Sequence, residues 1–431
     1  MTPPLLPGHP HFAYRDSALF VESVRISELA LTHGTPLFVY SKAAMLSALA
    51  AYQRGFAGRH AQICYAMKAN SSLAVLQVFA RAGCGFDIVS GGELERVQAA
   101  CGDMRKVIFS GVGKTRAEMR QALAAGIGCF NVESEAELNV LSEVAGTMKL
   151  QAPVSIRVNP NVDPKTHPYI STGLKGSKFG VAHEDALRLY RHAASLDNLR
   201  VIGIDCHIGS QITEVTPYLD AMDRMLDLVA AIEGAGIALE HIDFGGGLGI
   251  NYDNNDVPPE ADALWRQLLA KLDARGYGDK KLMIEPGRSL VGNAGICLTE
   301  VLYVKPGDHK NFCIIDAAMN DLPRPAMYQA FHAIVPVALP GKGVAANAEA
   351  TYDVVGPVCE SGDWIGRDRV LGIAAGEHLA VMSAGAYCMS MASNYNTRGR
   401  AAELLVDGDE VHVIRVRESA ADTFRTEKLL S

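Results

Sequence analysis

Apolar positions between about residues 42 and 290 fall into short runs that alternate with amphipathic stretches. A short apolar run bounded by turn residues is typical of a buried strand. The pattern predicts eight strands, at Ile63–Lys68, Gly85–Val89, Val107–Ser110, Gly128–Val132, Val154–Val158, Val201–His207, His241–Phe244 and Leu282–Glu285. Strands that alternate with helices in this way indicate an α/β fold, a parallel (β/α)8 TIM-like barrel.

Helical patterns lie between these runs. Ser71 and Ser72 can cap a helix over residues 73–81, Thr115 a helix over 116–125, and Ser134 a helix over 135–144. A longer amphipathic helix is predicted over Tyr218–Gly234. A doubly wound sheet is the alternative fold, but no Gly-x-Gly-x-x-Gly motif follows the first predicted strand.

After Gly287 short strand-like runs follow one another and helices become few, which predicts an all-β C-terminal domain. The runs are Ile296–Val304, Phe312–Asp316, Ala333–Leu339, Ala350–Val355, His378–Met382 and Glu410–Val416. The run Leu37–Tyr40 precedes the barrel and is expected to join this domain. We therefore predict a barrel domain over residues 42–290 and a β-sandwich or barrel-like domain over 1–41 and 291–431.

Composition narrows the class of protein. A chain of 431 residues is too long for one ordinary core, which agrees with two domains. A net charge of −8 argues against a nucleic-acid partner, and no apolar stretch reaches the length of a membrane helix. The N-terminus lacks the pattern of a signal peptide. Nine scattered cysteines without a Cys-x-x-Cys pair favour a reducing cytoplasm and no structural metal site.

Polar residues and glycines gather where the predicted barrel strands end. They are Lys68, Asp87, Arg157, His207 with Ser210, Gly245-Gly246-Gly247, and Glu285-Pro286-Gly287-Arg288. Each has a simpler interpretation. Lys68 could reach solvent, Asp87 could lie in a turn, and Arg157 could form a structural ion pair. His207 could be a core histidine, Gly245–Gly247 a tight turn, and Glu285 a helix cap. Because the C-terminal strand ends of a barrel meet at one mouth, their coincidence predicts an active site instead.

One cofactor, pyridoxal 5′-phosphate, suits this set of residues. A lysine at the rim of a core is expected to be partly buried, and burial favours the neutral amine that can form a Schiff base with an aldehyde. Gly245–Gly247 and the Gly287 region can bring backbone N–H groups close to a phosphate. Glu285 can hold a proton on the pyridine nitrogen, and His207 can stack on the ring.

The same segments resemble the fold-type III pyridoxal-phosphate-dependent decarboxylases, a family that includes ornithine, arginine and diaminopimelate decarboxylases. The resemblance rests on Tyr65–Asn70, His207–Gln211, Gly245–Gly249 and Glu285–Arg288, and it extends from about Thr35 to Asn396. Cys359-Glu360-Ser361-Gly362-Asp363 is similar to the family segment that crosses a homodimer interface into the partner's active site. The resemblance implies that Cys359 returns a proton to the α-carbon, whereas an ordinary buried cysteine is the simpler reading.

Met319–Tyr328 and Gly385–Ser390 are similar to motifs of the diaminopimelate decarboxylases. This similarity implies decarboxylation of meso-2,6-diaminopimelate to L-lysine and CO2, the last step of lysine biosynthesis. The distal end of that substrate carries both an amine and a carboxylate. Residues expected to bind it are Arg288, Arg324, Tyr328, Glu360 and Tyr387; Tyr387, Asp87, Arg157, Ser210 and Pro286 are also expected at the cofactor.

Two features leave alternatives open. A surface ion pair is the simpler reading of Arg324, and Pro323 stands where the family usually has an aliphatic residue. A sister decarboxylase acting on ornithine, arginine or carboxynorspermidine, an amino-acid racemase with a similar barrel, and a non-catalytic pyridoxal-phosphate-binding homologue are the rivals. A metal-dependent barrel enzyme is the last rival, and the sequence shows no compact ligand set for one.

Overall fold

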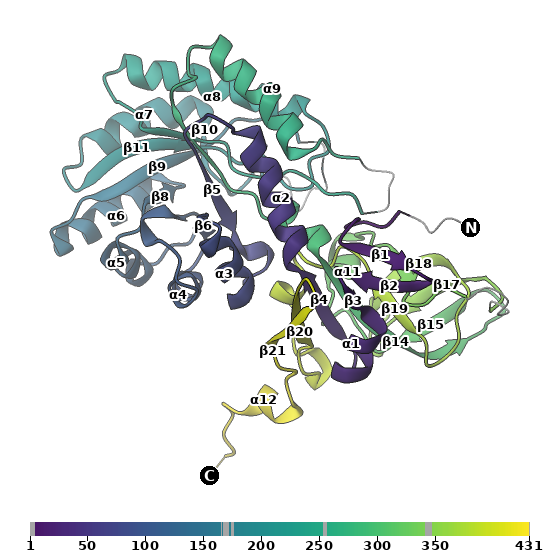
Figure 1. Cartoon of the computed structure of the whole chain (residues 1–431). Coiled ribbons are helices and arrows are strands. Elements are labelled where there is room, and N and C mark those ends of the chain that lie inside the picture. Colours follow the sequence, from purple (N-terminus) through teal and green to yellow (C-terminus); the bar gives the residue numbers. More distant parts are fainter. Residues whose placement is uncertain are drawn as a thin grey trace. The chain divides into compact units, whose positions relative to one another are not determined.

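The computed structural model describes residues 5–164, 166, 172–173, 176–252, 257–340 and 347–430. The chain divides into two compact units (Figure 1). The barrel unit consists of Ala48–Ile250 and Val257–Leu290, and the β unit of Met1–Ser47, Asn251–Asp256 and Val291–Ser431. That the chain folds as separate domains with boundaries at residues 42 and 290 stays a prediction. Within the described residues, no helix is both long and apolar enough to cross a membrane.

Eight parallel strands close into a barrel in the barrel unit. They are β5 (Ala61–Ala66), β6 (Gly85–Ile88), β7 (Val107–Phe109), β8 (Cys129–Val132), β9 (Ala152–Asn159), β11 (Leu199–Asp205), β12 (His241–Asp243) and β13 (Lys281–Ile284). Each strand pairs with the next, and β13 pairs with β5, with Ile284 opposite Ile63. A further short strand, β10 (Val181–Ala182), pairs in parallel with the end of β9 at Val158 and Asn159. Closure confirms the barrel and rules out the doubly wound sheet.

Helices connect successive barrel strands: α3 (Leu73–Arg81), α4 (Gly91–Ala99), α5 (Arg116–Ala125), α6 (Glu135–Met148), α7 (His183–Ala194), α8 (Thr216–Gly234) and α9 (Ala261–Ala274), with α2 (Lys42–Gly55) before β5. The predicted caps are confirmed at α5, where Thr115 forms a capping box with Glu118, and at α6, where Ser134 accepts from the Glu137 N–H. The predicted cap of α3 is wrong, because the Ser72 side chain makes no cap hydrogen bond.

Several barrel strands end earlier than the apolar runs predict. β5 ends at Ala66, whose N–H donates to Pro286 O, and Lys68 lies beyond it in the 3-10 turn η1 (Met67–Ala69). His207 likewise follows the end of β11 at Asp205, and Glu285 follows β13. These residues are therefore carried by the loops that leave the strands, which gives their side chains more freedom of direction than a strand position would.

The β unit is built on a nine-stranded sheet. Its main path runs β18 (Trp364–Leu371), β17 (Ala350–Val355), β15 (Asn311–Ile315), β14 (Gly295–Lys305), β4 (Leu37–Ser41), β20 (Ala402–Asp407) and β21 (Glu410–Arg415). β19 (His378–Val381) pairs with β14 and with β16 (Ile334–Pro336). The expected place of Leu37–Tyr40 is confirmed, because β4 lies between β14 and β20.

The sequence reading missed β18 and β20 and three short strands, β1 (Phe12–Arg15), β2 (Ala18–Val21) and β3 (Val24–Arg25), which form a separate sheet. β18 carries three charged residues, Arg367, Asp368 and Arg369, on exposed or half-buried positions, so no apolar run marks it. The unit also contains α1 (Ile26–His33), α11 (Arg324–Tyr328) and α12 (Ala420–Phe424). Side chains from β1, β2, α1, β4, β14 and β20 share one buried apolar core, which joins the N-terminal segment to the C-terminal strands.

Candidate active site

Lys68 and Asp87 form an ion pair at the mouth of the barrel. Lys68 Nζ lies 3.1 Å from Oδ2 of Asp87, which is carried by β6. The Lys68 side chain is 40% exposed, whereas that of Asp87 is fully buried. Lys68 is therefore partly buried, as expected for a lysine at the rim of a core, and the neutral state of its amine stays a prediction. The amine is accessible to a carbonyl compound that enters the mouth.

Three more buried carboxyl groups lie together at the strand ends. Asp205, Asp243 and Glu285 each offer an oxygen within 4.8 Å of the other two. Burial raises the pKa of Asp205 to about 7, and it raises the pKa of Asp243 and of Glu285 well above the ordinary range, helped by their mutual repulsion and by Asp87. Such a cluster binds protons more readily than isolated carboxyl groups do.

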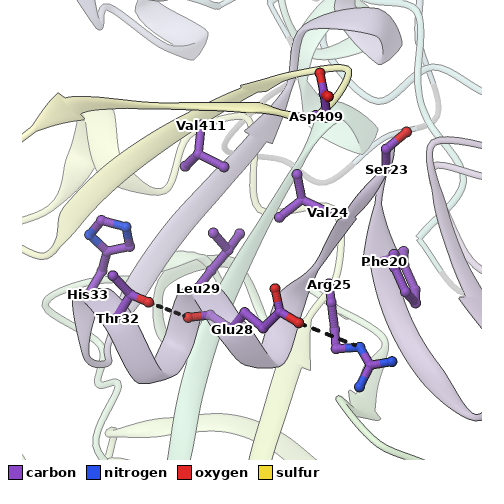
Figure 2. A pocket seen from close by; sticks show the side chains of 10 residues that line it. All are labelled: Phe20, Ser23, Val24, Arg25, Glu28, Leu29, Thr32, His33, Asp409 and Val411. Carbon is purple, nitrogen blue, oxygen red and sulfur yellow. Dashed lines mark hydrogen bonds and ion pairs between the residues drawn. The ribbon is translucent and has the colours of Figure 1, made fainter.

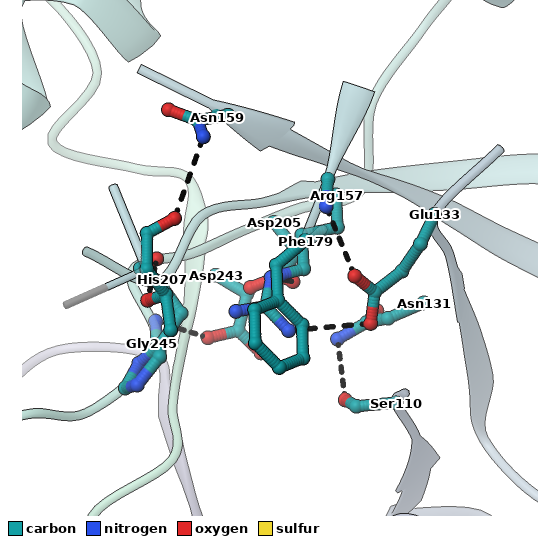
Figure 3. Close-up of polar contacts among 12 residues, drawn as sticks. Ser110, Asn131, Glu133, Arg157, Asn159, Phe179, Asp205, His207, Asp243 and Gly245 are labelled. Atoms are coloured by element: carbon teal, nitrogen blue, oxygen red, sulfur yellow. Dashed lines mark hydrogen bonds and ion pairs between the residues drawn. The ribbon is translucent and has the colours of Figure 1, made fainter. Parts of the chain in front are cut away.

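Arg157 supplies positive charge to the same region (Figure 3). Its Nη1 lies 3.3 Å from Glu133 Oε1, its Nε lies 3.9 Å from Asp205 Oδ2, and its guanidinium stacks 4.9 Å from the Phe179 ring. Glu133 also accepts from the N–H groups of Gly111 and Gly180. Arg157 therefore forms the structural ion pairs that were its simpler reading, and its part in cofactor binding stays a prediction.

His207 has a defined protonation state. Its Nδ1 accepts a hydrogen bond of 3.1 Å from the Gly246 N–H, which places the ring proton on Nε2. Burial lowers the pKa of His207 well below its ordinary value, and the nearby cations Arg157 and Lys68 act in the same direction. The ring is consequently a neutral, flat surface at neutral pH, which suits stacking against an aromatic ring.

The glycine segment Gly245–Gly247 leaves no room for side chains. A Cβ atom on Gly246 would lie 2.2 Å from Glu285 O, and one on Gly247, where φ is +102°, would lie 2.5 Å from Gly209 O. The Gly245 N–H donates to Asp243 Oδ1 and that of Gly246 to His207, so Gly247 is the residue of the segment that we expect to offer its N–H to a ligand.

Glu285 sits beside two neutral hydrogen-bonding side chains. Asn131 donates to Glu285 Oε1 over 3.1 Å, and Ser110 Oγ lies 3.5 Å from the same oxygen. Nearby, Arg288 at the start of α10 (Arg288–Val291) donates to Ser210 Oγ from Nη2 over 3.0 Å. The predicted residues Ser210 and Arg288 thus meet, although they are far apart in the sequence.

In the β unit, Arg324 is buried, with 6% of its surface exposed. Its Nη1 lies 2.8 Å from Nε2 of His332, and its guanidinium lies 4.7 Å from the centre of the Tyr252 ring. No acid of the described ranges forms an ion pair with it. The surface ion pair considered for Arg324 is therefore wrong. A buried cation without a carboxylate partner is costly, so the site favours an anionic ligand.

Cys359 is one of two exposed cysteines, with Cys101, whereas the other seven are buried. The reading of Cys359 as a buried structural cysteine is therefore wrong. Its N–H donates to Asn396 Oδ1, and the following carboxylate of Asp363 accepts from the N–H groups of Val358 and Met319. Asp363 thus joins the Cys359 segment to the Met319–Tyr328 segment. Of the other predicted substrate residues, Tyr328 and Tyr387 are half-buried and Glu360 is exposed.

Residues 42–292 match a family described as "Pyridoxal-dependent decarboxylase, pyridoxal binding domain". The chain is 54% identical to a diaminopimelate decarboxylase of Pseudomonas aeruginosa, over 97% of this chain and 99% of that relative. It is 51% identical to a diaminopimelate decarboxylase of Vibrio cholerae, over 97% of this chain and 99% of the relative. The chain belongs to the pyridoxal-dependent decarboxylases.

Solved structures of such decarboxylases have the same fold. A crystal structure of diaminopimelate decarboxylase from M. jannaschii in co-complex with L-lysine superposes with a TM-score of 0.93 and 37% identity, covering 99% of each chain. The Helicobacter pylori diaminopimelate decarboxylase complexed with L-lysine gives a TM-score of 0.87 and 39% identity, covering 93% of this chain and 98% of the other. The similarity spans both units and is not limited to the barrel.

The residues of this pyridoxal-dependent decarboxylase fit the cofactor of its family. Oδ1 of Asp87, Oδ1 of Asp205 and Oδ2 of Asp243 are buried without a hydrogen-bond partner among the described residues. With Glu285 they make an excess of negative charge, which a protonated pyridine nitrogen would compensate. The glycine segment leaves bare backbone for a phosphate, and Lys68 offers an accessible amine. The same excess of acid could bind a metal ion, but family membership and Lys68 favour the pyridoxal group.

A groove in the β unit of the decarboxylase lies outside this set (Figure 2). It has a volume of about 600 Å³ and is lined by residues from α1, β2, β3 and the turn before β21. Its charged residues include Arg25 and Glu28, which form an ion pair of 3.9 Å, together with Asp409. None of the predicted site residues lines this groove, and it is not required for the site described above.

The decarboxylase site also contains residues that the sequence reading missed. Asp205 and Asp243 are the last residues of β11 and β12, but the predicted runs extend to His207 and Phe244, so the rule applied to Lys68 does not single them out. Asn131 and Glu133 flank the end of β8. His332 had no such signal, because it lies outside any helix or strand and its contact with Arg324 depends on the turn at Gln329, where φ is +52°.

Proposed function

We propose that this chain decarboxylates meso-2,6-diaminopimelate to L-lysine and CO2, as the last step of lysine biosynthesis in the cytoplasm. The relatives that are 51–54% identical over nearly the full chain carry the name of that activity. The observation that carries the substrate assignment is the burial of Arg324 without an acid partner in the described residues. A substrate whose far end bears a carboxylate would supply the missing anion.

Bound pyridoxal phosphate supplies an electron sink for the charge that develops at the amino-acid α-carbon when CO2 leaves. Lys68 provides the amine that holds the cofactor aldehyde. Glu285 holds a proton at the pyridine nitrogen, since Asn131 and the neighbouring acids fix its position and charge. His207 would hold the cofactor ring as a neutral imidazole. Asp87 positions Lys68, and Gly247 with the Gly287 region binds the phosphate.

The distal end of the substrate is bound by charged residues of both signs. Arg324 and Arg288 bind the distal carboxylate, and Tyr328 donates a hydrogen bond to it. Glu360 takes the distal ammonium, and Tyr387 contributes to both the cofactor and the substrate. Fixing this end would orient the reacting carboxylate for the chemistry that the cofactor would supply.

Cys359 completes the reaction by moving a proton from its Sγ to the α-carbon. An exposed cysteine on a loop can enter a neighbouring subunit's site, whereas a buried one could not. We infer that the chain acts as a homodimer in which the Cys359 segment of each subunit serves its partner. The exposure of Cys359 and Glu360 supports this assignment.

The experiment is a substrate panel for the chain loaded with pyridoxal phosphate. Release of CO2 from meso-diaminopimelate, with little from ornithine, arginine or carboxynorspermidine, supports the proposal. Turnover of ornithine or arginine instead would keep the cofactor chemistry and overturn the role of Arg324. Interconversion of stereoisomers without CO2 would favour the racemase, and cofactor binding without any turnover would favour a non-catalytic homologue.

A further inference from the structure

Arg324, His332 and Tyr252 form a buried group within the β unit. His332 is fully buried, and Tyr252 and Arg324 are 7% and 6% exposed. The His332 ring meets the Tyr252 ring edge-on, with centroids 5.2 Å apart and planes at 77°. The Arg324 guanidinium lies over the face of the same tyrosine. Three side chains from separate segments therefore hold one another in a single arrangement.

The hydrogen bonds of His332 define its tautomer. A guanidinium can only donate, so Nε2 of His332 must accept the 2.8 Å bond from Arg324 Nη1. A carbonyl oxygen can only accept, so Nδ1 must donate the 2.9 Å bond to Met382 O. His332 therefore links the guanidinium to the backbone at the end of β19, and the imidazole is neutral in this arrangement.

These contacts occupy only part of the guanidinium. His332 takes one of its five N–H groups, and Tyr252 covers one of its faces. A hydrogen bond to a neutral imidazole fixes the direction of the group without cancelling its charge, as a carboxylate partner would. Among the described residues, the guanidinium thus keeps its positive charge in one orientation, with N–H groups left for a second ligand.

We propose that His332 is a positioning residue that fixes the Arg324 guanidinium to receive the distal carboxylate of the substrate, and so sets the preference for a zwitterionic distal end. This inference rests on the proposed function. The inference adds His332 as the residue that holds Arg324 in place. The turn at Gln329 separates the two residues in the sequence. Pro323, which stands where the family usually has an aliphatic residue, directly precedes Arg324. Arg324 binds the substrate, and His332 acts through Arg324.

Replacing His332 with asparagine or with glutamine distinguishes its hydrogen bond to Met382 O from its hydrogen bond with Arg324. His332→Asn keeps a donor near the position of Nδ1 but is too short to accept from Arg324. His332→Gln reaches the position of Nε2 and can accept. For the holoenzyme acting on meso-diaminopimelate, we expect His332→Asn to raise KM about 10- to 100-fold with kcat within about 3-fold, the range for losing a charge-assisted hydrogen bond. His332→Gln should recover most of that loss.

The control is the same substitution in an Arg324→Leu background. If His332 acts through Arg324, His332→Asn adds little to the KM of Arg324→Leu. Thermal unfolding and the visible absorbance of the bound cofactor show whether each variant is folded and loaded. If His332→Asn does not fold, His332→Phe fills the space without an acceptor and is measured in its place.

The outcomes for the two proposals differ. A wild-type enzyme that releases no CO2 from diaminopimelate overturns the proposed function and this inference together. An active wild type in which Arg324→Leu raises KM but His332→Asn does not overturns the inference alone. Equal effects of His332→Asn with and without Arg324 would also overturn it, because they would show a general structural role.

Discussion

Lys68 Nζ lies 3.1 Å from Oδ2 of Asp87, and the other carboxylate oxygen of Asp87 is buried without a hydrogen-bond partner among the described residues. The pair stands at the border between solvent and a buried acidic cluster. The charge of Asp87 helps to raise the pKa of Glu285 and of Asp243. Asp87 thus positions the amine and at the same time adds to the repulsion within the barrel mouth.

Asp87→Asn is expected to stabilise the cofactor-free protein and to weaken cofactor binding. Removing a buried negative charge relieves repulsion, while Lys68 loses little because its side chain is 40% exposed. The gain in unfolding free energy should be about 1 kcal/mol. Thermal unfolding without cofactor and titration with pyridoxal phosphate measure the two effects. A less stable Asp87→Asn protein would show that the ion pair outweighs the repulsion.

Asp205 gives the cofactor-free protein a distinct dependence on pH. Burial raises its pKa in the folded state to about 7, above the value of about 4 for an unfolded aspartate. The folded state therefore binds more protons between pH 4 and 7, so this group's contribution to stability is lost as pH rises through that window. The slope for one proton is at most about 1.4 kcal/mol per pH unit.

The measurement compares unfolding of wild type and Asp205→Asn from pH 5 to 8 without cofactor. The free energy of unfolding of Asp205→Asn should rise relative to that of the wild type as pH rises. Asp197→Asn, at an exposed position, is the matched control and should follow the wild-type curve. Parallel curves for wild type and Asp205→Asn would contradict the assignment.

Ser72 and Thr115 both precede a predicted helix, but replacing them with alanine should change the free energy of unfolding by different amounts. Thr115→Ala breaks the capping box of α5 and should cost about 1 kcal/mol of unfolding free energy. Ser72→Ala should cost much less, because the Ser72 side chain makes no cap hydrogen bond at α3. Denaturant unfolding of the two variants decides this, and equal losses would count against it.

The sequence predicts the positions of the barrel strands better than it predicts where they end. Periodicity located all eight barrel strands, because their apolar runs are buried on both faces. It failed for β18, where charged residues interrupt the run, and it placed Lys68 on a strand that ends at Ala66. Strand ends depend on where the next loop offers a hydrogen bond, as Pro286 does for Ala66, and no local pattern records that.

Some residues of the candidate site could likewise be predicted from the sequence, and others could not. Lys68, His207 and Glu285 could be predicted because each follows a recognisable strand. Asp205 and Asp243 end β11 and β12 in the structure, but the apolar runs extend beyond both residues, so the sequence pattern does not mark them as strand ends. The Arg324–His332 contact could not be predicted, since it depends on a left-handed turn at Gln329 and on burial by the sheet of the β unit.

Cys359→Ala should slow turnover by 10²-fold or more while the visible absorbance of the bound cofactor stays near that of the wild type, since the effect of losing a positioned proton donor is of this size. Cys101→Ala is the matched control, because Cys101 is the other exposed cysteine, and it should retain full activity. Loss of cofactor from Cys359→Ala would contradict a purely proton-transferring role.

The central claim is that Lys68 carries the cofactor with which this chain converts diaminopimelate. The most direct test incubates wild type and Lys68→Ala with pyridoxal phosphate and meso-diaminopimelate and measures CO2 and L-lysine together. The account predicts equal amounts of the two products from the wild type and neither from Lys68→Ala. Full turnover by Lys68→Ala, or CO2 from the wild type without lysine, would contradict it.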